Sequence, residues 1–307
     1  MKLTIFTPAY NRAQLVYRLY ESLERQTVKD FEWIIVDDAS PDNTQEVVED
    51  FMKDHEGYDI IYYRQEHGGK HRAINYAVSI ARGSFFFIVD SDDYLVDTAV
   101  EQILSWIEGA EDDPKLAGVS GLRVSENGTV WGVSDNSEIA SKMGTYVDAT
   151  NFERAKYKLT GDKAEVYKTE ILKKFPFPEF DNEYFVTEAV VWDAIAHAGY
   201  KVRWYYEPIY ICDYLEDGLT KNGANEMKGR INNYRGYCHF IEQSLRIVPM
   251  KERMVRFRAF DKTRKAMNKS MGEAARDLGL SLGKYMYLLF VQLPAVYAVR
   301  MLDKLAK

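Results

Sequence analysis

Residues 85–93 of the chain read Phe85-Phe86-Phe87-Ile88-Val89-Asp90-Ser91-Asp92-Asp93. The five apolar residues at the start are typical of a strand that is buried on both faces of a sheet. The run ends at three carboxylates in four positions, and Asp90 and Asp92 would point the same way if the strand continued. Carboxylate oxygens suit Mg2+ and Mn2+, together with oxygens of a substrate phosphate. The stretch therefore favours a metal and phosphate site, with a solvated acidic turn as the alternative.

The size and composition of the chain are those of a globular protein. Its 307 residues can form one large domain with an appendage. The two cysteines, Cys212 and Cys238, are too few for a disulfide framework. A strand-like segment stands at the N-terminus in place of a signal peptide, and no apolar run reaches the ~18–20 residues that span a bilayer. We expect a cytoplasmic protein.

The net charge of −7 is unevenly spread along the chain. From Lys228 to the end there are 17 Lys and Arg against 6 Asp and Glu, a net charge of +11. The preceding residues therefore carry a net charge of −18. An acidic body with a basic tail indicates two units with different partners. We expect a main domain over residues 1–224 and a basic, amphipathic helical region over residues 225–307.

Strand-like and helix-like segments alternate over the first 95 residues. The strands are expected at residues 3–7, 31–36, 59–63 and 85–89. Helices are expected to begin after Asn11, at Ser40-Pro41 and after Gly69. This alternation is typical of βαβ units and predicts an α/β fold with a mostly parallel sheet.

Polar residues follow each of these strands. They are Thr7 to Asn11, Asp37-Asp38, Gly68 to Arg72, and Asp90 to Asp93. Ligands of such sheets bind outside the carboxyl ends of the strands, so four polar ends in succession indicate one binding site. Neither a G-x-G-x-x-G nor a G-x-x-x-x-G-K-[ST] motif is present, which argues against a dinucleotide dehydrogenase and a P-loop ATPase. A diphosphate would then be bound mainly through a metal on the aspartates.

In order and spacing, four motifs resemble those of family 2 glycosyltransferases of the GT-A fold. They are Thr7 to Arg12, Val36 to Ser40, Gly69 to Asn75, and Val89 to Asp93. The resemblance covers about residues 1–220. It implies a GT-A, Rossmann-like sheet flanked by helices, with a C-terminal helical extension. It also implies inverting transfer of a sugar from a nucleotide-diphospho-sugar, commonly a UDP-sugar, to an acceptor hydroxyl.

The resemblance also implies roles for single residues. Asp92 would be the main ligand of Mn2+ or Mg2+, with Asp90 on the ribose or sharing the metal. Thr7 and Asp38 would lie around the base and ribose, and the basic residues after Gly69 near the nucleotide. The expected donor-binding residues are Thr7, Pro8, Tyr10, Arg12, Asp38, Lys70, His71, Arg72, Asp90 and Ser91, together with Thr220 and Lys221 further along the chain.

Inverting transfer needs a base on the face of the sugar opposite the leaving diphosphate. The family often has an acidic pair before an amphipathic helix, and the second acid is the base. Thr187-Glu188 stands at that position, so Glu188 is the predicted base, although Thr replaces the first acid and Glu the usual Asp. The alternative for Glu188 is an acid favoured by the dipole of a helix N-terminus. Asp193 is the rival base; it lies about 500° further around the helix, and its alternative is a solvated or salt-bridged residue.

The region after residue 210 yields two further expectations. Related enzymes close a loop over the diphosphate with a hydroxyl or a cation, so Thr220 and Lys221 are candidates, with a flexible surface loop as the alternative. Residues 285–299 are almost uniformly apolar and follow a dense set of Arg and Lys, which fits an interfacial helix on an anionic membrane surface. The alternatives are a helix packed on the catalytic domain or on a second copy of the chain in a homo-oligomer. No recognised nucleic-acid-binding module accompanies the basic tail.

We therefore expect a metal-dependent inverting glycosyltransferase that builds a bacterial capsule, exopolysaccharide or cell-wall glycan on a glycan or lipid-linked acceptor. It would be cytoplasmic, or peripheral on the inner face of the plasma membrane. Two other classes stay open. A metal-dependent nucleotidyltransferase would use a similar sheet but release pyrophosphate, and a non-catalytic protein would bind sugar nucleotides or membranes without turnover.

Overall fold

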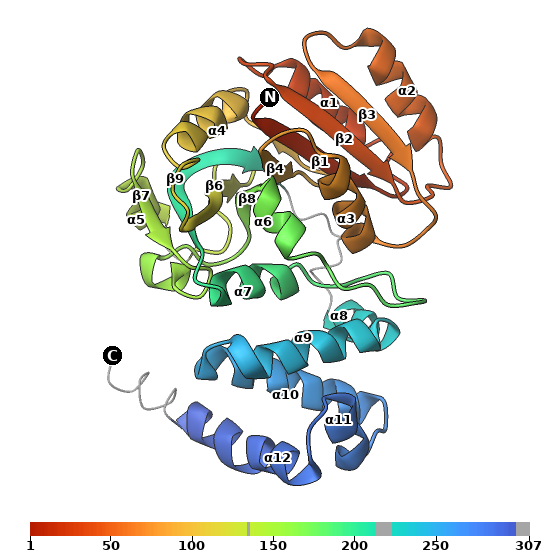
Figure 1. Ribbon diagram of the computed structural model, residues 1–307, viewed down its shortest axis with the longest axis vertical. Helices are drawn as coiled ribbons and strands as arrows, with labels where there is room; N and C mark the ends of the chain where they lie inside the picture. Colours follow the sequence, from red (N-terminus) through yellow and green to blue (C-terminus); the bar gives the residue numbers. More distant parts are fainter. Residues whose placement is uncertain (134–135, 213–222, 299–307) are drawn as a thin grey trace.

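The computed structural model describes residues 1–133, 136–212 and 223–298 (Figure 1). Within these ranges, nine strands form one sheet in the order β3-β2-β1-β4-β8-β6-β9-β5, with β7 beside β9. The strands are β1 (Leu3–Ala9), β2 (Phe31–Asp37), β3 (Asp59–Arg64), β4 (Phe85–Ile88), β5 (Tyr94–Leu95), β6 (Leu116–Val124), β7 (Tyr146–Ala149), β8 (Lys163–Lys168) and β9 (Lys201–Ile211).

The N-terminal half of the sheet has the predicted parallel arrangement. Strand β1 pairs in parallel with β2 on one side and with β4 on the other, and β3 extends the sheet beyond β2. The register places Ala9 beside Asp37 and Phe6 beside Ile88, so the segments that follow these strands leave the sheet at one edge. Beyond β4 the sheet is mixed, because β8 is antiparallel to both β4 and β6.

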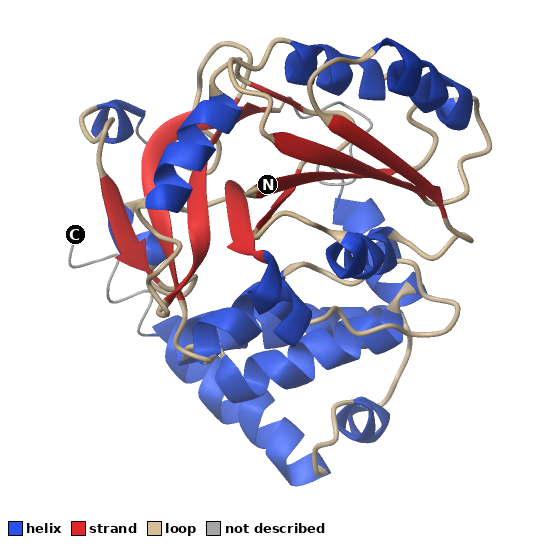
Figure 2. Ribbon diagram, turned by 45° about the horizontal axis from the view of Figure 1, so that its top comes forward, coloured by secondary structure: helices blue, strands red, loops and turns tan. Residues whose placement is uncertain are grey.

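Helices cover both faces of the sheet (Figure 2). Phe85 and Phe87 of β4 pack in a core with α1 (Val16–Glu24), α2 (Thr44–Asp54) and α4 (Ala99–Glu108). Phe86 packs on the other face with α3 (Lys70–Ile80), α6 (Thr169–Lys174) and α7 (Ala189–His197). Full burial of each such side chain is worth about 1.5–3 kcal/mol. The predicted two-sided burial of this strand is confirmed. The short α5 (Asn136–Ala140) and the 3-10 helix η1 (Arg154–Tyr157) lie in the connections beyond β6.

The first two helices begin later than predicted. Helix α1 starts at Val16, because Asn11 has a left-handed φ of 55° and its N–H donates to Ser40 Oγ over 2.9 Å. Helix α2 starts at Thr44 for the same reason, since Ser40 is used to bind the neighbouring loop and not to cap a helix. These long-range contacts tie the loops after β1 and β2 together at the carboxyl edge of the sheet.

The C-terminal region is helical, as predicted. It comprises α8 (Gly223–Asn232), α9 (Tyr234–Ile247), α10 (Met250–Ala266), α11 (Met271–Asp277) and α12 (Leu282–Tyr287), which continues as the π-helix η2 (Leu288–Gln292). These helices share a core of their own, and α9 faces α7 in Figure 1. Gln243 Nε2 of α9 donates to the carbonyl of Val190 in α7 over 2.7 Å. In the described part of the chain, no helix is long and apolar enough to cross a membrane.

Candidate active site

Three of the predicted site residues meet at the carboxyl edge of the sheet. Lys70 is the first residue of α3, Asp90 follows β4, and Glu188 immediately precedes α7. The Lys70 ammonium donates to Asp90 Oδ1 over 2.7 Å and lies 2.9 Å from Glu188 Oε1. The side chains of Lys70, Asp90 and Glu188 are 32%, 28% and 31% exposed, so a ligand can reach all three. Lysine therefore bridges the aspartate of the acidic turn and the predicted base.

Lys70 and Asp90 are both charged at neutral pH. Burial opposes the charge of Asp90, but the Lys70 ammonium and the Arg123 guanidinium, 3.7 Å away, outweigh it and lower the pKa of Asp90. Burial likewise works against a charged Lys70, but the carboxylates of Asp90 and Glu188 raise its pKa. The cluster therefore presents one fixed positive charge between two acidic side chains.

Two residues that no sequence motif marks complete the acidic turn. Tyr210 is fully buried; its hydroxyl donates to Asp93 Oδ2 over 2.7 Å and accepts from the Asp90 N–H over 3.0 Å. Arg123 lies over the Tyr210 ring, 4.2 Å from its centroid. Burial, followed by the neighbouring Asp90 charge, raises the pKa of Asp93 to about 7. Asp93 therefore stabilises the turn through its hydrogen bond with Tyr210. Its position in the sequence, beside the other aspartates, did not indicate this role.

The carboxylate of Asp92 is the one best placed to take a metal ion. It is half-buried and makes no hydrogen bond or ion pair within the described residues, whereas Lys70 already engages Asp90. No three His, Cys, Asp or Glu of the described chain lie close enough together to hold a metal by themselves. Mg2+ is commonly bound by one or two carboxylates, with phosphate oxygens and water as its other ligands. The donor set therefore fits a divalent ion that binds together with a diphosphate.

Asp38 is buried and holds the turn before α3. It accepts hydrogen bonds from the backbone N–H groups of Gly68 and Gly69 over 2.7 and 2.9 Å, and from Gln65 Nε2 over 2.6 Å. His67 Nδ1 lies 2.9 Å from its other oxygen. The carboxylate thus fixes the position from which Lys70 reaches Asp90. Its contact with a base or ribose stays a prediction.

The residues after β1 lie at different depths. Thr7 is fully buried, and its hydroxyl accepts a hydrogen bond from Trp33 Nε1 over 2.9 Å, which places this side chain beneath the edge and not on it. Ser91 is buried as well, while Pro8 and Arg12 are half-buried. Tyr10 is exposed, and its ring stacks on His67, which stacks in turn on Tyr184. These three rings form an aromatic row at the edge.

The two basic residues after Lys70 point elsewhere. His71 is buried, and neither ring nitrogen has a hydrogen-bonding partner among the described residues. Burial lowers the pKa of His71, so the ring is neutral at pH 7. The guanidinium of Arg72 donates to the carbonyl of Phe180 over 2.9 Å and lies 3.6 Å from Glu179. Successive helix residues point about 100° apart, so the three basic side chains have different neighbours. That His71 and Arg72 lie near the nucleotide stays a prediction.

Two further predictions concern residues downstream. Asp193 is fully buried and forms an ion pair with Arg256 of α10, so the salt-bridged alternative is confirmed, and this burial argues against Asp193 as the base. Thr220 and Lys221 lie outside the described residues. Their role over the diphosphate stays a prediction.

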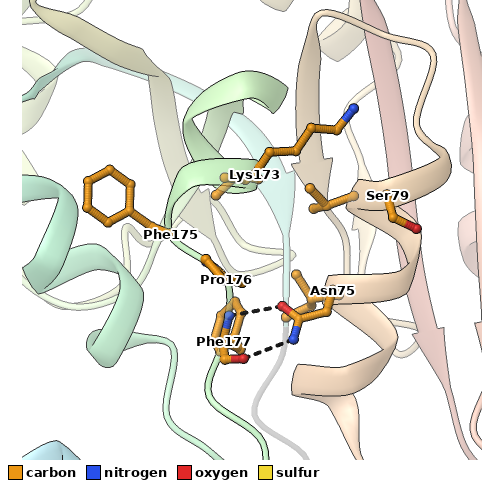
Figure 3. Close-up of a pocket in the computed structure, with 9 residues that line it drawn as sticks. Asn75, Ser79, Lys173, Phe175, Pro176 and Phe177 are labelled. Atoms are coloured by element: carbon orange, nitrogen blue, oxygen red, sulfur yellow. Dashed lines mark hydrogen bonds between the residues drawn. The ribbon is translucent and has the colours of Figure 1, made fainter.

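A hollow of about 160 Å3 lies between α3 and residues 172–177 (Figure 3). Its lining is mostly apolar and includes none of the acidic residues of the edge. The side chain of Asn75 closes one side of it by accepting from the N–H and donating to the carbonyl of Phe177, both over 2.9 Å. The hollow therefore belongs to the packing of α3 against the chain that leads to Glu188.

Comparison with known proteins places this fold and site in a class. Residues 4–174 match the family model of glycosyl transferase family 2, which is more than half of the chain. The chain therefore belongs to glycosyl transferase family 2, as the sequence motifs predicted. The matched range ends before Glu188, so the assignment of the base rests on position and geometry alone.

Curated relatives come from bacterial glycan synthesis. The chain is 32% identical over 135 residues to a poly(ribitol-phosphate) beta-glucosyltransferase of Bacillus spizizenii, a match that covers 41% of this chain and 21% of the relative. It is 25% identical over 268 residues to the GalNAc(5)-diNAcBac-PP-undecaprenol beta-1,3-glucosyltransferase of Campylobacter jejuni, covering 85% and 79%. The chain thus spans only about a fifth of the first of these relatives.

Solved structures share the fold. S. aureus TarS 1-349 in complex with UDP-GlcNAc superposes with a TM-score of 0.57 at 18% identity, covering 99% of this chain and 92% of that one. Mannosyltransferase PcManGT of Pyrobaculum calidifontis, in complex with GDP-Man and Mn2+, gives a TM-score of 0.53 at 19% identity, covering 100% and 76%. The predicted α/β fold with helices on both faces of the sheet is confirmed.

Proposed function

We propose that the protein transfers a sugar from a nucleotide-diphospho-sugar, a UDP-sugar in the first place, to an acceptor hydroxyl with inversion. The observation that carries this proposal is the Lys70 bridge, which holds Asp90 of the acidic turn and Glu188 within one charged cluster at the edge where such sheets bind ligands. An inverting sugar transfer needs a base for the acceptor hydroxyl, and Glu188 in this cluster can serve as one. This supports sugar transfer ahead of the nucleotidyltransferase alternative.

In this reaction Glu188 takes the proton of the acceptor hydroxyl as the acceptor oxygen bonds to the anomeric carbon. The bond from that carbon to the diphosphate breaks, and its electron pair leaves with the nucleoside diphosphate. Lys70 orients Glu188 and places a positive charge beside the incoming diphosphate. Asp92, with Asp90, would hold Mg2+ or Mn2+, which neutralises charge on the leaving group when bound.

The acceptor we propose is a glycan or a lipid-linked glycan of a bacterial surface polymer. Two relatives support it by their names, one acting on poly(ribitol-phosphate) and one on an undecaprenol-linked glycan. Incubation with Mn2+ or Mg2+ and a panel of UDP-, GDP- and dTDP-sugars should release free nucleoside diphosphate from one of them. Release of pyrophosphate from a nucleoside triphosphate would point to a nucleotidyltransferase. If no sugar nucleotide is bound or consumed, the proposal is wrong.

A second proposal concerns the C-terminal helices, which we infer bind an anionic membrane surface. Tyr285 and Leu288 are buried in the helical core, but the other side of this terminal helix exposes a set of apolar residues: Leu282, Met286, Tyr287, Phe290 and Val291. The neighbouring α10 exposes cations, and its Arg258 lies 4.6 Å from the centroid of the Tyr297 ring. An apolar face beside a cationic one is typical of interfacial helices.

A hollow in the same region suits a phosphate headgroup. It measures about 220 Å3, and its lining includes Arg246, Arg253 and Lys284 against one acid, Glu242. The Nε of Arg253 is buried with no partner among the described residues. A free donor and an excess of positive charge favour an anionic group.

Vesicle sedimentation tests the membrane proposal. The protein should pellet with phosphatidylglycerol vesicles at low salt and much less with phosphatidylcholine vesicles. Met286→Glu should weaken this binding. Met52→Glu on α2 is a matched control, since Met286 and Met52 are 41% and 42% exposed. If the wild-type protein stays in solution with phosphatidylglycerol vesicles at low salt, the surface has another role.

A further inference from the structure

The chain that leads to Glu188 runs along α3 and is bound to it at successive turns. Asn75 contacts the backbone of Phe177, and Arg72 donates to the carbonyl of Phe180. Further towards Glu188 the two backbones touch: a Cβ added to Gly69 would lie 1.9 Å from the carbonyl oxygen of Tyr184. Residues 177–188, termed the acid-bearing segment, are therefore fixed against the helix that carries Lys70.

The C-terminal helices bind the other side of the same segment. Glu183 is buried, and its carboxylate accepts the backbone N–H groups of Arg235 and Gly236 at the start of α9, both over 2.7 Å. Asn233 Oδ1 accepts the N–H groups of Tyr184 and Phe185 over 2.8 and 3.0 Å. Four hydrogen bonds thus join three consecutive residues of the segment to the N-terminus of α9.

The two bonds to Glu183 satisfy N–H groups that have no acceptor within α9. The first N–H groups of a helix have no intrahelical acceptor, and the helix dipole favours a negative charge beside them. Glu183 supplies that charge from the sheet domain. The amide of Asn233 is held in one orientation because its Nδ2 donates to the carbonyl of Gly229 over 2.9 Å. Close packing at Gly236, where a Cβ would lie 3.2 Å from Val186, leaves little room for the segment to shift.

We propose that Glu183 and Asn233 are positioning residues for the transfer reaction, and that the C-terminal helices thereby hold Glu188 within reach of Lys70 and the acceptor. This inference rests on the proposed function, in which Glu188 is the base. Only Val186 and Thr187 separate Phe185 from Glu188. Release of Tyr184 and Phe185 therefore frees the approach to Glu188. The residues at the acidic turn are untouched by such a release.

The expected effect is on turnover and not on donor binding. A displacement of about 1 Å at a reacting group can reduce a rate by as much as about 100-fold. Asn233→Leu, which removes the acceptor oxygen at similar size, should lower kcat by about 10- to 100-fold. The donor KM should stay within about twofold, because Asp90 and Asp92 lie outside the segment that is released and Lys70 keeps its contact with Asp90. Asn233→Asp keeps an acceptor oxygen and should retain most of the activity.

A matched control lies in the same helical region. Glu273 of α11 also accepts a backbone N–H, from Ser270 over 2.8 Å, but does not contact the acid-bearing segment. Glu183→Gln should lower kcat, because one amide N–H would then face another, whereas Glu273→Gln should not. Hydrogen exchange at the Tyr184 and Phe185 amides should accelerate in Asn233→Leu and Glu183→Gln only.

The outcomes separate this inference from the function on which it rests. If Glu188→Gln is inactive and both Asn233→Leu and Glu183→Gln turn over like the wild type, the positioning role is wrong and the proposed function stands. If Glu188→Gln turns over normally, the base is wrong, and amide exchange alone decides whether the helices fix the segment. Equal losses in Glu273→Gln, or a loss in donor affinity as large as the loss in kcat, would also overturn the positioning role. Should Asn233→Leu fail to fold, Glu183→Gln and Asn233→Asp carry the same comparison.

Discussion

Helix α7 presents two acidic residues to two different surroundings. Glu188, at its N-terminal end, is 31% exposed and contacts Lys70 at the edge of the sheet. Asp193, just over one turn later, is 1% exposed and paired with Arg256 of α10. Both are carboxylates with a cationic partner. The difference lies in which element supplies the partner, and it leaves only Glu188 open to a substrate.

Removal of the Glu188 charge should have the largest effect. A general base contributes about 10²- to 10⁴-fold to a rate, so Glu188→Gln should lower kcat by that factor while leaving donor affinity nearly unchanged. Steady-state turnover and titration of the nucleotide measure the two quantities. Full activity of Glu188→Gln would show that Glu188 is not the base.

Removal of Asp193 should affect the fold and not the chemistry. Breaking a buried ion pair by deleting one partner costs about 3–5 kcal/mol when the other charge is left buried and unpaired. Arg256 keeps Glu252 as a second partner, so Asp193→Ala should lower the free energy of unfolding in urea by at most about this amount. The double variant Asp193→Leu with Arg256→Met should recover much of the loss. If Asp193→Ala were as stable as the wild type but inactive, the roles of the two acids would be reversed.

Lys163 differs from Glu188 and Asp193, because it is a buried ionisable residue without an ion-pair partner in the described chain. Its ammonium donates to the carbonyls of Trp131, Thr160 and Asp162. Burial, followed by the nearby Arg154, lowers the pKa of Lys163 to about 8. Above pH 8 the folded protein therefore binds fewer protons at this residue than the unfolded chain, whose lysine titrates near 10.4.

Stability should therefore rise with pH in this window, the reverse of what a salt-bridged lysine would give. The free energy of unfolding of the wild type, relative to that of Lys163→Met, should increase by at most about 1.4 kcal/mol per pH unit between pH 8 and 10. Urea unfolding of both proteins at pH 7.5, 8.5 and 9.5 measures this gap. A gap that shrinks as the pH rises would indicate an ion pair.

The elements of the site could be predicted from the sequence because they follow local rules. A run of apolar residues that ends in Asp90 marks a strand end wherever the strand lies in the sheet, and Glu188 stands at a recognisable distance before a helix. The motifs also placed Lys70 at the site. The direction of each side chain was harder to predict. The sequence suggests one basic cluster made of Lys70, His71 and Arg72, but on a helix these side chains point in different directions and have different neighbours.

What could not be predicted depends on contacts between distant parts of the chain. Asn11 is a good helix N-cap by type, but its bond to Ser40 places it in a loop. Arg123 lies on β6 and Tyr210 on β9, and no local sequence pattern predicts that these two strands pair. The two residues support the acidic turn only because β6 and β9 are neighbours. Asp193 could not be told from Glu188 until α10 was seen to supply Arg256.

Glu183 and Asn233 form hydrogen bonds in opposite directions between the acid-bearing segment and the C-terminal helices, and this has a consequence for chimeras between relatives. A graft that exchanges only the C-terminal helices would pair a foreign α9 with the native acid-bearing segment. It would lose the two hydrogen bonds to Asn233 wherever the foreign chain has another residue at this position. A graft that starts at Phe177 would carry both partners together, but would then have to match Asn75, Arg72 and Gly69 of α3. The acid-bearing segment and the C-terminal helices should therefore be exchanged together, in a chimera that preserves their contacts with α3.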